Sequence, residues 1–303
     1  MQTRRIALKI DVDTLRGTRE GVPRLVAALR QAQAGASFFF SLGPDHTGRA
    51  LKRVFRRGFL GKVRRTSVVE HYGIRTLLYG TVLPGPRIDL KGGEAMRAVR
   101  DAGFEVGVHC HDHVRWQDGV AHADAAWTRR EFVRALEAFQ GVFGAAPRSH
   151  AAAGWQLNAQ VLELEHEFDL AYASDARGAS PFWPTMGAVQ GRCLQLPTTL
   201  PTFDELIGVD GMDAPAAAER LLRESRAGVT DTHVFTLHAE LEGQKLLPQF
   251  EWLLRRWREA GVLLTSLRDY HQGLDGATIA RRELVWGTVP GRSGTLAAQG
   301  GPA

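Results

Sequence analysis

The chain has 303 residues, 44% of them hydrophobic, which is enough to bury a substantial core in one large domain. Two cysteines are too few for a disulfide framework or a cysteine-based zinc site, and we expect both thiols to be reduced. The net charge of +5 is compatible with nucleic acid, an anionic membrane or a phosphate-bearing substrate as partner. The N-terminus holds no apolar run of signal-peptide length, and no run of about 18 apolar residues occurs, so we expect a cytoplasmic protein without a transmembrane helix.

Short apolar runs along the chain predict buried strands. These runs are Arg5–Ile10, Ser37–Leu42, Phe104–Val108, Leu170–Tyr172, Cys193–Leu196, His233–Leu237 and Val262–Thr265. Helical patterns lie between many of them, at Glu20–Gln33, Gly92–Ala102, Asp124–Phe143, Pro215–Ala227 and Leu246–Ala260. Strands that alternate with helices and are apolar on both faces are typical of a parallel sheet or barrel. We therefore predict an α/β fold.

Two segments interrupt this alternation. The segment from about Pro44 to Pro86 is too long for an ordinary connection between elements. The tail from 276 to 303 ends in a Gly- and Ala-rich stretch, and we predict that it is partly disordered. The expected organisation is a barrel over 1–275 with an insertion at about 44–90, followed by the tail.

The first predicted strand ends in two carboxylates, Asp11 and Asp13, followed by Thr14. Active sites of α/β barrels lie at the C-terminal ends of the strands, so both aspartates are candidates for catalysis or metal binding. The alternative is a strand end at which Asp13 or Thr14 starts a turn, which is a common use of these residues.

Three histidines within five residues follow the third predicted strand, which is a sharper signal. His109 and His113 are four residues apart and lie on one face if the segment turns helically. Two imidazoles and one carboxylate form a common catalytic metal set, so we predict one divalent ion at Asp13, His109 and His113. His111 and Asp112 are candidates to orient these ligands. The alternative is a polar loop whose histidines are incidental.

A late predicted strand ends in a histidine, His238. By itself such a residue is more often structural, but beside the other two segments it is a candidate general acid, because its ordinary pKa lies near neutrality. Together the segments predict metal-dependent amide hydrolysis, in which Asp11 accepts the proton of a water and His238 protonates the departing amine. The metal itself remains open among zinc, cobalt and manganese.

These motifs resemble those of the polysaccharide deacetylase (NodB-homology) superfamily. The resemblance implies a distorted (β/α) barrel and metal-dependent removal of an acyl group from the nitrogen of an amino sugar. In that superfamily the first aspartate is the base, the second aspartate and two histidines bind the metal, and the late histidine is the acid. The corresponding residues here are Asp11, Asp13, His109, His113 and His238.

Longer runs resemble one branch of the superfamily, the ArnD deformylases. They are Lys9–Arg24, Ser149–Trp155, Leu196–Gly208 and His238–Gly243. This resemblance covers nearly the whole chain. It implies deformylation of 4-deoxy-4-formamido-L-arabinose carried on undecaprenyl phosphate, a step that serves lipid A modification and polymyxin resistance. Two alternatives stay open: another amino-sugar de-N-acetylase of the superfamily, and a non-catalytic protein that binds a membrane surface.

The sequence departs from the superfamily pattern at two points. One residue separates the two aspartates, which are usually adjacent, and the usual Arg-x-Pro motif is absent, with Ala151–Trp155 at its expected position. Asp175 and Arg177 are candidates to take its role, the alternative being a surface ion pair between them. Arg16 and Glu240 are further candidates to contact the substrate or to support the site.

The insertion is strongly basic. Between His46 and Arg75 it holds nine lysines and arginines against a single acid, and apolar residues recur there at helical spacing. This pattern is typical of a basic amphipathic helix that binds an anionic membrane. The residues expected at the membrane surface are Lys52, Arg53, Phe55, Arg56, Arg57 and Phe59.

A helical subdomain packed on the barrel is the alternative interpretation of this insertion. We expect no nucleic acid partner, because no nucleic-acid motif accompanies the basic run. A polyprenyl-phosphate substrate stays in the bilayer, so the resemblance favours peripheral association with the cytoplasmic face of the inner membrane.

Overall fold

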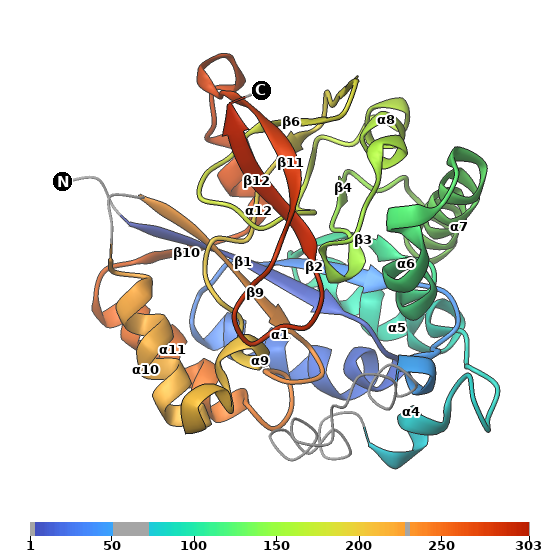
Figure 1. Ribbon diagram of the computed structural model, residues 1–303. Coiled ribbons are helices and arrows are strands. Elements are labelled where there is room, and N and C mark those ends of the chain that lie inside the picture. The colour runs from blue at the N-terminus through green and yellow to red at the C-terminus, as the bar shows by residue number, and fades with distance from the viewer. Residues whose placement is uncertain (1–3, 51–72, 228–230, 303) are drawn as a thin grey trace.

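The structure is a computed structural model that describes residues 4–50, 73–227 and 231–302. Figure 1 shows a parallel sheet across the centre of the molecule. Its strands are β1 (Arg5–Val12), β2 (Ser37–Ser41), β3 (Glu105–Cys110), β4 (Ser149–His150), β5 (Tyr172–Ala173), β8 (Leu194–Gln195), β9 (Thr232–His238) and β10 (Leu263–Thr265). They lie in the order β10-β1-β2-β3-β4-β5-β8, and β9 also pairs with β1. The predicted strands therefore form one parallel sheet.

The sheet curls into an irregular barrel, in which β1 is a strand of the wall with neighbours on both edges. Along one edge β1 pairs with β9, while its other edge pairs first with β10 and then, from Lys9 onward, with β2. After β8 the chain returns to β9, where the backbone N–H groups of Thr199 and Leu200 donate to the carbonyl oxygen of Val234 at 3.1 and 3.2 Å. This return confirms the predicted distorted (β/α) barrel.

Two hydrophobic clusters pack on the two faces of the sheet. The side chains of β1 alternate between them, with Leu8 and Ile10 in the outer cluster and Ala7 in the inner one. Because successive residues of a strand point to opposite faces, Lys9 and Asp11 share the inner face with Ala7. β1 thus brings charged side chains inside the barrel.

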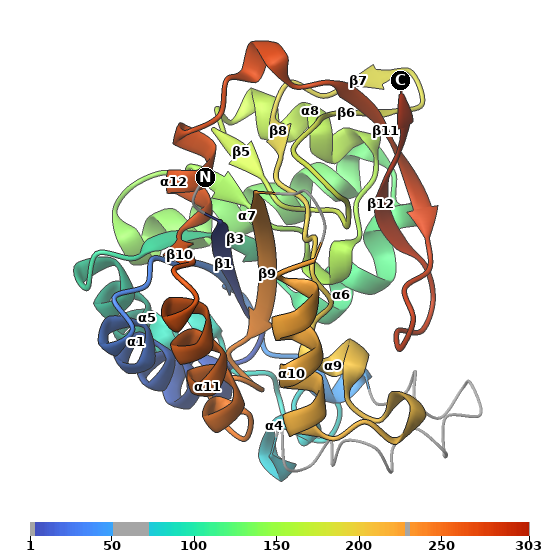
Figure 2. The ribbon, with the colours of Figure 1, turned by 90° about the vertical axis from the view of Figure 1, so that its left-hand side faces the viewer.

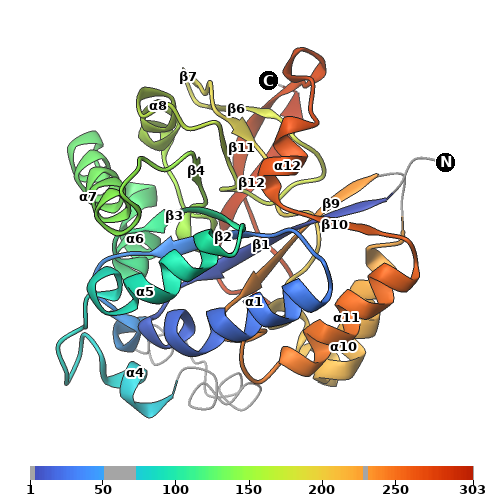
Figure 3. The same cartoon turned by 180° about the vertical axis from the view of Figure 1, so that it is seen from behind.

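Helices cover the outer face of the sheet, as the view from behind shows for α1, α5 and α11 (Figure 3). The helices are α1 (Val22–Gln31), α4 (Ile74–Leu78), α5 (Ile88–Asp101), α6 (His113–Gly119), α7 (Ala125–Phe143), α8 (Ala159–Glu167), α9 (Phe203–Leu206), α10 (Ala214–Glu224), α11 (Leu247–Glu259) and α12 (Leu267–Gln272). Aspartates cap the starts of several: Asp124 accepts from the backbone of Trp127 in α7, and Asp213 from that of Ala216 in α10. The predicted helices agree with the observed ones to within a few residues.

The C-terminal tail forms a hairpin, so the prediction that it is partly disordered is wrong. Strands β11 (Arg281–Gly287) and β12 (Leu296–Pro302) pair antiparallel, and β11 also pairs with β6 (Trp183–Met186), which pairs with β7 (Val189–Gln190). The physical reason is that Leu284 and Ala297 are buried in the main core, and Leu296 is buried as well, so that they anchor a sequence otherwise poor in large apolar residues. Figure 2 shows the hairpin running alongside the barrel towards α9.

The basic part of the insertion lies outside the described residues. The predictions for Lys52, Arg53, Phe55, Arg56, Arg57 and Phe59 therefore stay predictions. The described flank of the insertion comprises α4 and the loop that leads to α5. Within the described ranges, no helix is long and apolar enough to cross a bilayer. Cys110 and Cys193 are buried free thiols, as expected.

Candidate active site

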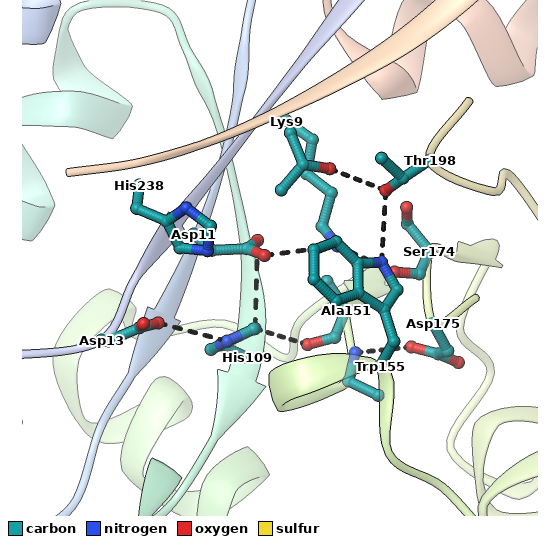
Figure 4. Close-up of polar contacts among 12 residues, drawn as sticks. Lys9, Asp11, Asp13, His109, Ala151, Trp155, Ser174, Asp175, Thr198 and His238 are labelled. Carbon is teal, nitrogen blue, oxygen red and sulfur yellow. Dashed lines mark hydrogen bonds and ion pairs between the residues drawn. The ribbon is translucent and has the colours of Figure 1, made fainter. Parts of the chain in front are cut away.

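The three predicted metal ligands meet at the C-terminal ends of β1 and β3. Asp13 follows β1, His109 lies near the end of β3, and His113 is the first residue of α6. Asp13 Oδ1 lies 3.3 Å from His109 Nε2, and Asp13 Oδ2 lies 3.4 Å from His113 Nε2. The candidate ligand atoms of the three residues all lie within 4.8 Å of one another, and Figure 4 shows Asp13 beside His109.

The chemistry of these donors fits a divalent cation. His109 Nδ1 lies 2.6 Å from the carbonyl oxygen of Ala151, which only accepts, so Nδ1 carries the proton. With Nδ1 engaged in this way, Nε2 is the ring nitrogen that faces Asp13 and can bind a cation. Burial raises the pKa of Asp13, but His113 and His109 outweigh burial and hold the pKa below its usual range. Asp13 is therefore ionised, as a metal ligand must be.

The loop between β3 and α6 places His113. Asp112 is the N-cap of α6: its Oδ1 accepts from the backbone N–H of Arg115 at 3.1 Å, and its Oδ2 lies 2.6 Å from His46 Nδ1. Asp112 thus fixes the start of the helix that carries a ligand. The ring of His111 points elsewhere and lines a groove between α5 and α7, so the structure does not bring this candidate to the other ligands.

Asp11 lies next to a buried cation that the sequence interpretation missed. Asp11 Oδ2 is 3.4 Å from Lys9 Nζ, and Lys9 is fully buried (Figure 4). Lys9 Nζ also donates to the carbonyl oxygen of Ser174 at 2.9 Å and lies 5.3 Å from the ring centre of Trp155. Asp11 Oδ1 is buried and accepts no hydrogen bond from the described residues. The available signal was the alternation along β1, which puts Lys9, Asp11 and Asp13 on one face.

His238, the predicted acid, ends β9 and faces another residue that was missed. Its Nδ1 lies 3.9 Å from Asp204 Oδ1 in α9. Burial lowers the pKa of His238, but Asp204 and then Asp13 outweigh burial and raise the pKa to about 9. His238 is therefore protonated at neutral pH. The backbone N–H of His238 donates to Glu242 Oε2 at 2.7 Å, which fixes the end of the strand.

Glu240 supports the turn that presents Asp13. Its Oε1 accepts from the backbone N–H groups of Asp13 and Thr14, at 3.1 and 2.8 Å, and from Thr14 Oγ1 at 2.8 Å. A Cβ at Gly17 would overlap this same oxygen, which explains the glycine there. Burial and the charge of Asp13 raise the pKa of Glu240 to about 8. The carboxyl group of Glu240 therefore holds the loop after β1 in place through these three hydrogen bonds.

Asp175 is fully buried behind the ligand His109. Its Oδ1 accepts from the backbone N–H of Ala152 at 2.7 Å, and its Oδ2 accepts from Gln195 Nε2 at 2.9 Å. The neighbouring carbonyl of Ala151 is the one that orients His109. Asp175 therefore holds the backbone next to the carbonyl group that orients His109, and its proposed part in place of the Arg-x-Pro motif stays a prediction.

Arg177 pairs with Glu205, not with Asp175. Its Nη1 donates to Glu205 Oε1 at 2.9 Å, and Glu205 is buried, so the alternative of a surface ion pair is wrong. Arg16 is partly exposed and its Nε donates to Glu20 Oε2 at 3.0 Å. The side chain of Arg16 also lies beside Gly73, at the edge of the insertion.

The chain is similar to known proteins over most of its length. The sequence profile of the polysaccharide deacetylase family matches residues 1–173. A protein of Shewanella sediminis is 34% identical over 297 residues, covering 97% of this chain and 94% of its own length. One from Wigglesworthia glossinidia brevipalpis is 31% identical, covering 93% and 98%. Both are named 4-deoxy-4-formamido-L-arabinose-phosphoundecaprenol deformylase ArnD.

The fold is also found among solved structures. One from Mycobacterium smegmatis, described as a polysaccharide deacetylase, has a TM-score of 0.62 at 18% identity. The match covers 95% of this chain and 96% of that one. At this level of identity the likeness concerns the fold alone.

Proposed function

The chain belongs to the polysaccharide deacetylase family, and from this premise we propose that it deformylates 4-deoxy-4-formamido-L-arabinose linked to undecaprenyl phosphate. It is a hydrolase that acts on an amide bond. The names of the two relatives, which match nearly the whole chain, support the narrower substrate. The reaction would be a step in the modification of lipid A with aminoarabinose, and so in polymyxin resistance.

One arrangement carries this proposal: a buried carboxylate and a protonated histidine flank a single set of metal ligands. Asp13, His109 and His113 are the residues that would hold the ion. A divalent cation bound there would polarise the amide carbonyl and lower the pKa of water. Two histidines and one aspartate suit zinc, cobalt or manganese.

Asp11 is the general base in this mechanism. Its Oδ1 lies buried 4.0 Å from His109 Nδ1, with lone pairs that no described residue occupies, and it accepts a proton from the attacking water. Its Oδ2 faces Lys9, whose ammonium group keeps the carboxylate in one orientation. The carboxylate of Asp11 is thereby oriented before the substrate binds, which lowers the free-energy barrier of the reaction.

His238 is the general acid. It is protonated at neutral pH and donates its proton to the sugar nitrogen as the C–N bond breaks, so that formate and a free amine leave. Asp204 stabilises the imidazolium from the other side of the ring. Base and acid come from β1 and β9, which are adjacent strands, so their spacing is fixed by the sheet.

The flank of the insertion supports peripheral binding to an anionic membrane. Ile74, Val82 and Leu90 are large apolar residues that remain 69%, 75% and 75% exposed, and they fall within one short stretch of chain. The insertion begins beside the site, because Asp45 accepts from the backbone N–H of Leu15 at 3.0 Å. An apolar surface next to a basic run would bring the site to a substrate that stays in the bilayer.

The function is tested with formamido-arabinose phosphoundecaprenol and its N-acetyl analogue. The metal-loaded protein is incubated with each, and released formate and acetate are measured. Formate release that a chelator and His109→Ala both abolish supports the proposal. Acetate release alone would assign another de-N-acetylase activity. Release of neither product, with metal bound, would favour a non-catalytic binding protein.

Membrane binding is tested by co-sedimentation with anionic and neutral liposomes. Charge reversal at Arg53, Arg56 and Arg57 should weaken binding to anionic liposomes, and Val82→Ser with Leu90→Ser should weaken it further. Unchanged co-sedimentation of both variants would count against membrane association through the insertion.

A further inference from the structure

The segment that follows β2 lies between the two segments that carry the candidate metal ligands. β2 pairs with β1 along one edge and with β3 along the other. Asp13 follows β1, while His109 lies near the end of β3 and His113 begins α6. Parallel strands end on the same face, so the residues after β2 can contact both ligand-bearing segments at once. The first such contact is the backbone N–H of Gly43, which donates to the carbonyl oxygen of His111 at 2.6 Å.

Asp45 holds the loop that presents Asp13. Its Oδ2 accepts from the backbone N–H of Leu15 at 3.0 Å, and its Oδ1 accepts from the backbone N–H and Oγ1 of Thr47, at 3.2 and 2.7 Å. The two preceding N–H groups of the loop donate to Glu240. Two buried carboxyl groups, one after β2 and one after β9, therefore fix three consecutive N–H groups of this loop from both sides of β1.

His46, the next residue, holds the start of the helix that carries His113. Its Nδ1 lies 2.6 Å from Asp112 Oδ2 and donates to it, because a carboxylate oxygen only accepts. The other carboxylate oxygen of Asp112 accepts from the backbone N–H of Arg115 at 3.1 Å. Asp112 is thus held from two directions, and it directly precedes the ligand His113.

The described part of the insertion that leads back to the barrel, residues 79–86, keeps Asp45 and His46 in place. We call this part the return limb. The backbone N–H of Asp45 donates to the carbonyl oxygen of Pro86 at 2.9 Å. Gly80 and Gly85 lie so close to the ring of His46 that a Cβ at either glycine would overlap its Cδ2 atom. The return limb therefore confines the imidazole to the position in which Nδ1 reaches Asp112.

We propose that Asp45 and His46 are positioning residues of the metal centre, and that the return limb of the insertion holds them in place. The inference rests on the metal ligands of the proposed function. Asp45 acts through the loop after β1, and His46 acts through Asp112, so together they fix the separation of the ligands Asp13 and His113. Groups that orient metal ligands in this way contribute about 10–100-fold to metal affinity.

The test measures metal binding without any substrate. Co²⁺ is titrated into the folded protein by calorimetry, well below the melting temperature, and the visible absorption of bound Co²⁺ reports the geometry of its ligands. His46→Leu removes the donor to Asp112 and should weaken Co²⁺ binding about 10–100-fold and alter the spectrum. His46→Asn places an amide N–H near the position of Nδ1 and should restore both. His46→Gln, whose amide lies near the position of Nε2, should behave as His46→Leu and takes its place if that variant does not fold.

His233→Leu is the matched control for the histidine. His233 Nδ1 also lies within hydrogen-bond distance of an oxygen, 3.0 Å from Thr199 Oγ1, but it is near the start of β9, and the opposite end of that strand carries His238. Its loss should leave the affinity for Co²⁺ and the spectrum unchanged, even if the melting temperature falls.

Gly85→Ala tests the return limb from outside the metal centre. The added methyl group would overlap the carbonyl oxygen of Asp45 and the ring of His46, so this variant should also weaken Co²⁺ binding. Gly141→Ala on α7 is its control, because a Cβ there meets no atom within 4 Å. Co²⁺ binding that is unchanged in Gly85→Ala would overturn the role of the return limb.

Two results would overturn the role of His46. One is a folded His46→Leu variant with the Co²⁺ affinity and spectrum of the wild type. The other is a loss in His46→Asn as large as in His46→Leu, because the ring would then act by packing and not by its hydrogen bond. Failure of the proposed function gives a different result: the wild type binds Co²⁺, and His109→Ala does not, but no formate is released. That outcome rejects the substrate and leaves the comparison of the His46 variants valid.

Discussion

Replacing Lys9 with methionine tests the role of the buried cation on β1. Methionine keeps most of the volume of the lysine stem and removes the ammonium group that lies 3.4 Å from Asp11 Oδ2. Because Lys9 is fully buried, its loss cannot remove a contact with substrate at the surface. The expected effect is therefore on kcat, with little change in KM.

The size of the effect follows from the buried pair. Removing one partner of a buried ion pair costs about 3–5 kcal/mol, because the remaining charge is left uncompensated. For a chain of this length, such a loss lowers Tm by roughly 5–8 °C. A base displaced by about 1 Å costs about 100-fold in rate. We expect Lys9→Met to fold, to melt earlier and to lose about 100-fold in kcat.

Formate release at several substrate concentrations separates kcat from KM, and calorimetry reports the melting temperature and the affinity for metal. Metal affinity should stay close to that of the wild type, because the polar contacts of Lys9 are with Asp11 and the carbonyl oxygen of Ser174, not with the metal ligands. A double-mutant cycle of Lys9→Met with Asp11→Asn isolates the interaction between Lys9 and Asp11. The double variant should be little slower than Asp11→Asn alone, since residues that act as one unit are not additive.

Two results would refute this reasoning. One is a Lys9→Met variant that is folded at the assay temperature and keeps kcat within about threefold of the wild type, the range of a neutral substitution. The other is a cycle in which the two losses multiply, because Lys9 would then act on something other than Asp11.

Three further predictions concern the same site. Metal in 100-fold excess over Kd should stabilise the wild-type protein by about 2.7 kcal/mol in a thermal melt and leave His113→Ala unchanged. The rate should fall as pH rises through the pKa of His238, about 9, because the neutral ring has no proton to give. Asp204→Asn should move this fall to lower pH, because it removes the charge that raises the pKa of His238. A pH–rate profile that does not move would contradict the role of Asp204. Gly17→Ala should cost about 1–3 kcal/mol in urea unfolding, because its methyl group overlaps Glu240.

Most of the sheet could be predicted from the sequence for a simple physical reason. Parallel strands buried on both faces need apolar residues at nearly every position, and the fully buried β2, Ser-Phe-Phe-Phe-Ser, is an example. β4 was missed because its two residues, Ser149 and His150, are polar. Their burial depends on side chains elsewhere in the chain, such as Glu165, whose Oε1 lies 3.0 Å from His150 Nδ1. A local sequence pattern does not reveal such partners.

In the active site, too, residues at the ends of apolar strands could be predicted, and residues placed by distant partners could not. Asp13, His109 and His238 follow apolar strands, so their shared location could be predicted from the rule that strand ends meet at one face. Asp204 has no such marker. It lies on a four-residue helix, and its place beside His238 is set by tertiary contacts alone.

We infer that two segments of the chain share the place of the absent Arg-x-Pro motif. Ala151–Trp155 supplies a carbonyl to His109 and an aromatic ring, with Gly154 and Trp155 both at positive φ to turn the ring inward. The cation comes instead from Lys9, against that ring and beside the base. Neither segment is informative by itself, since a lysine in a strand and a Gly-Trp pair are ordinary. In this chain the informative feature is the combination of a lysine two residues before the first aspartate with Gly-Trp where arginine would be expected.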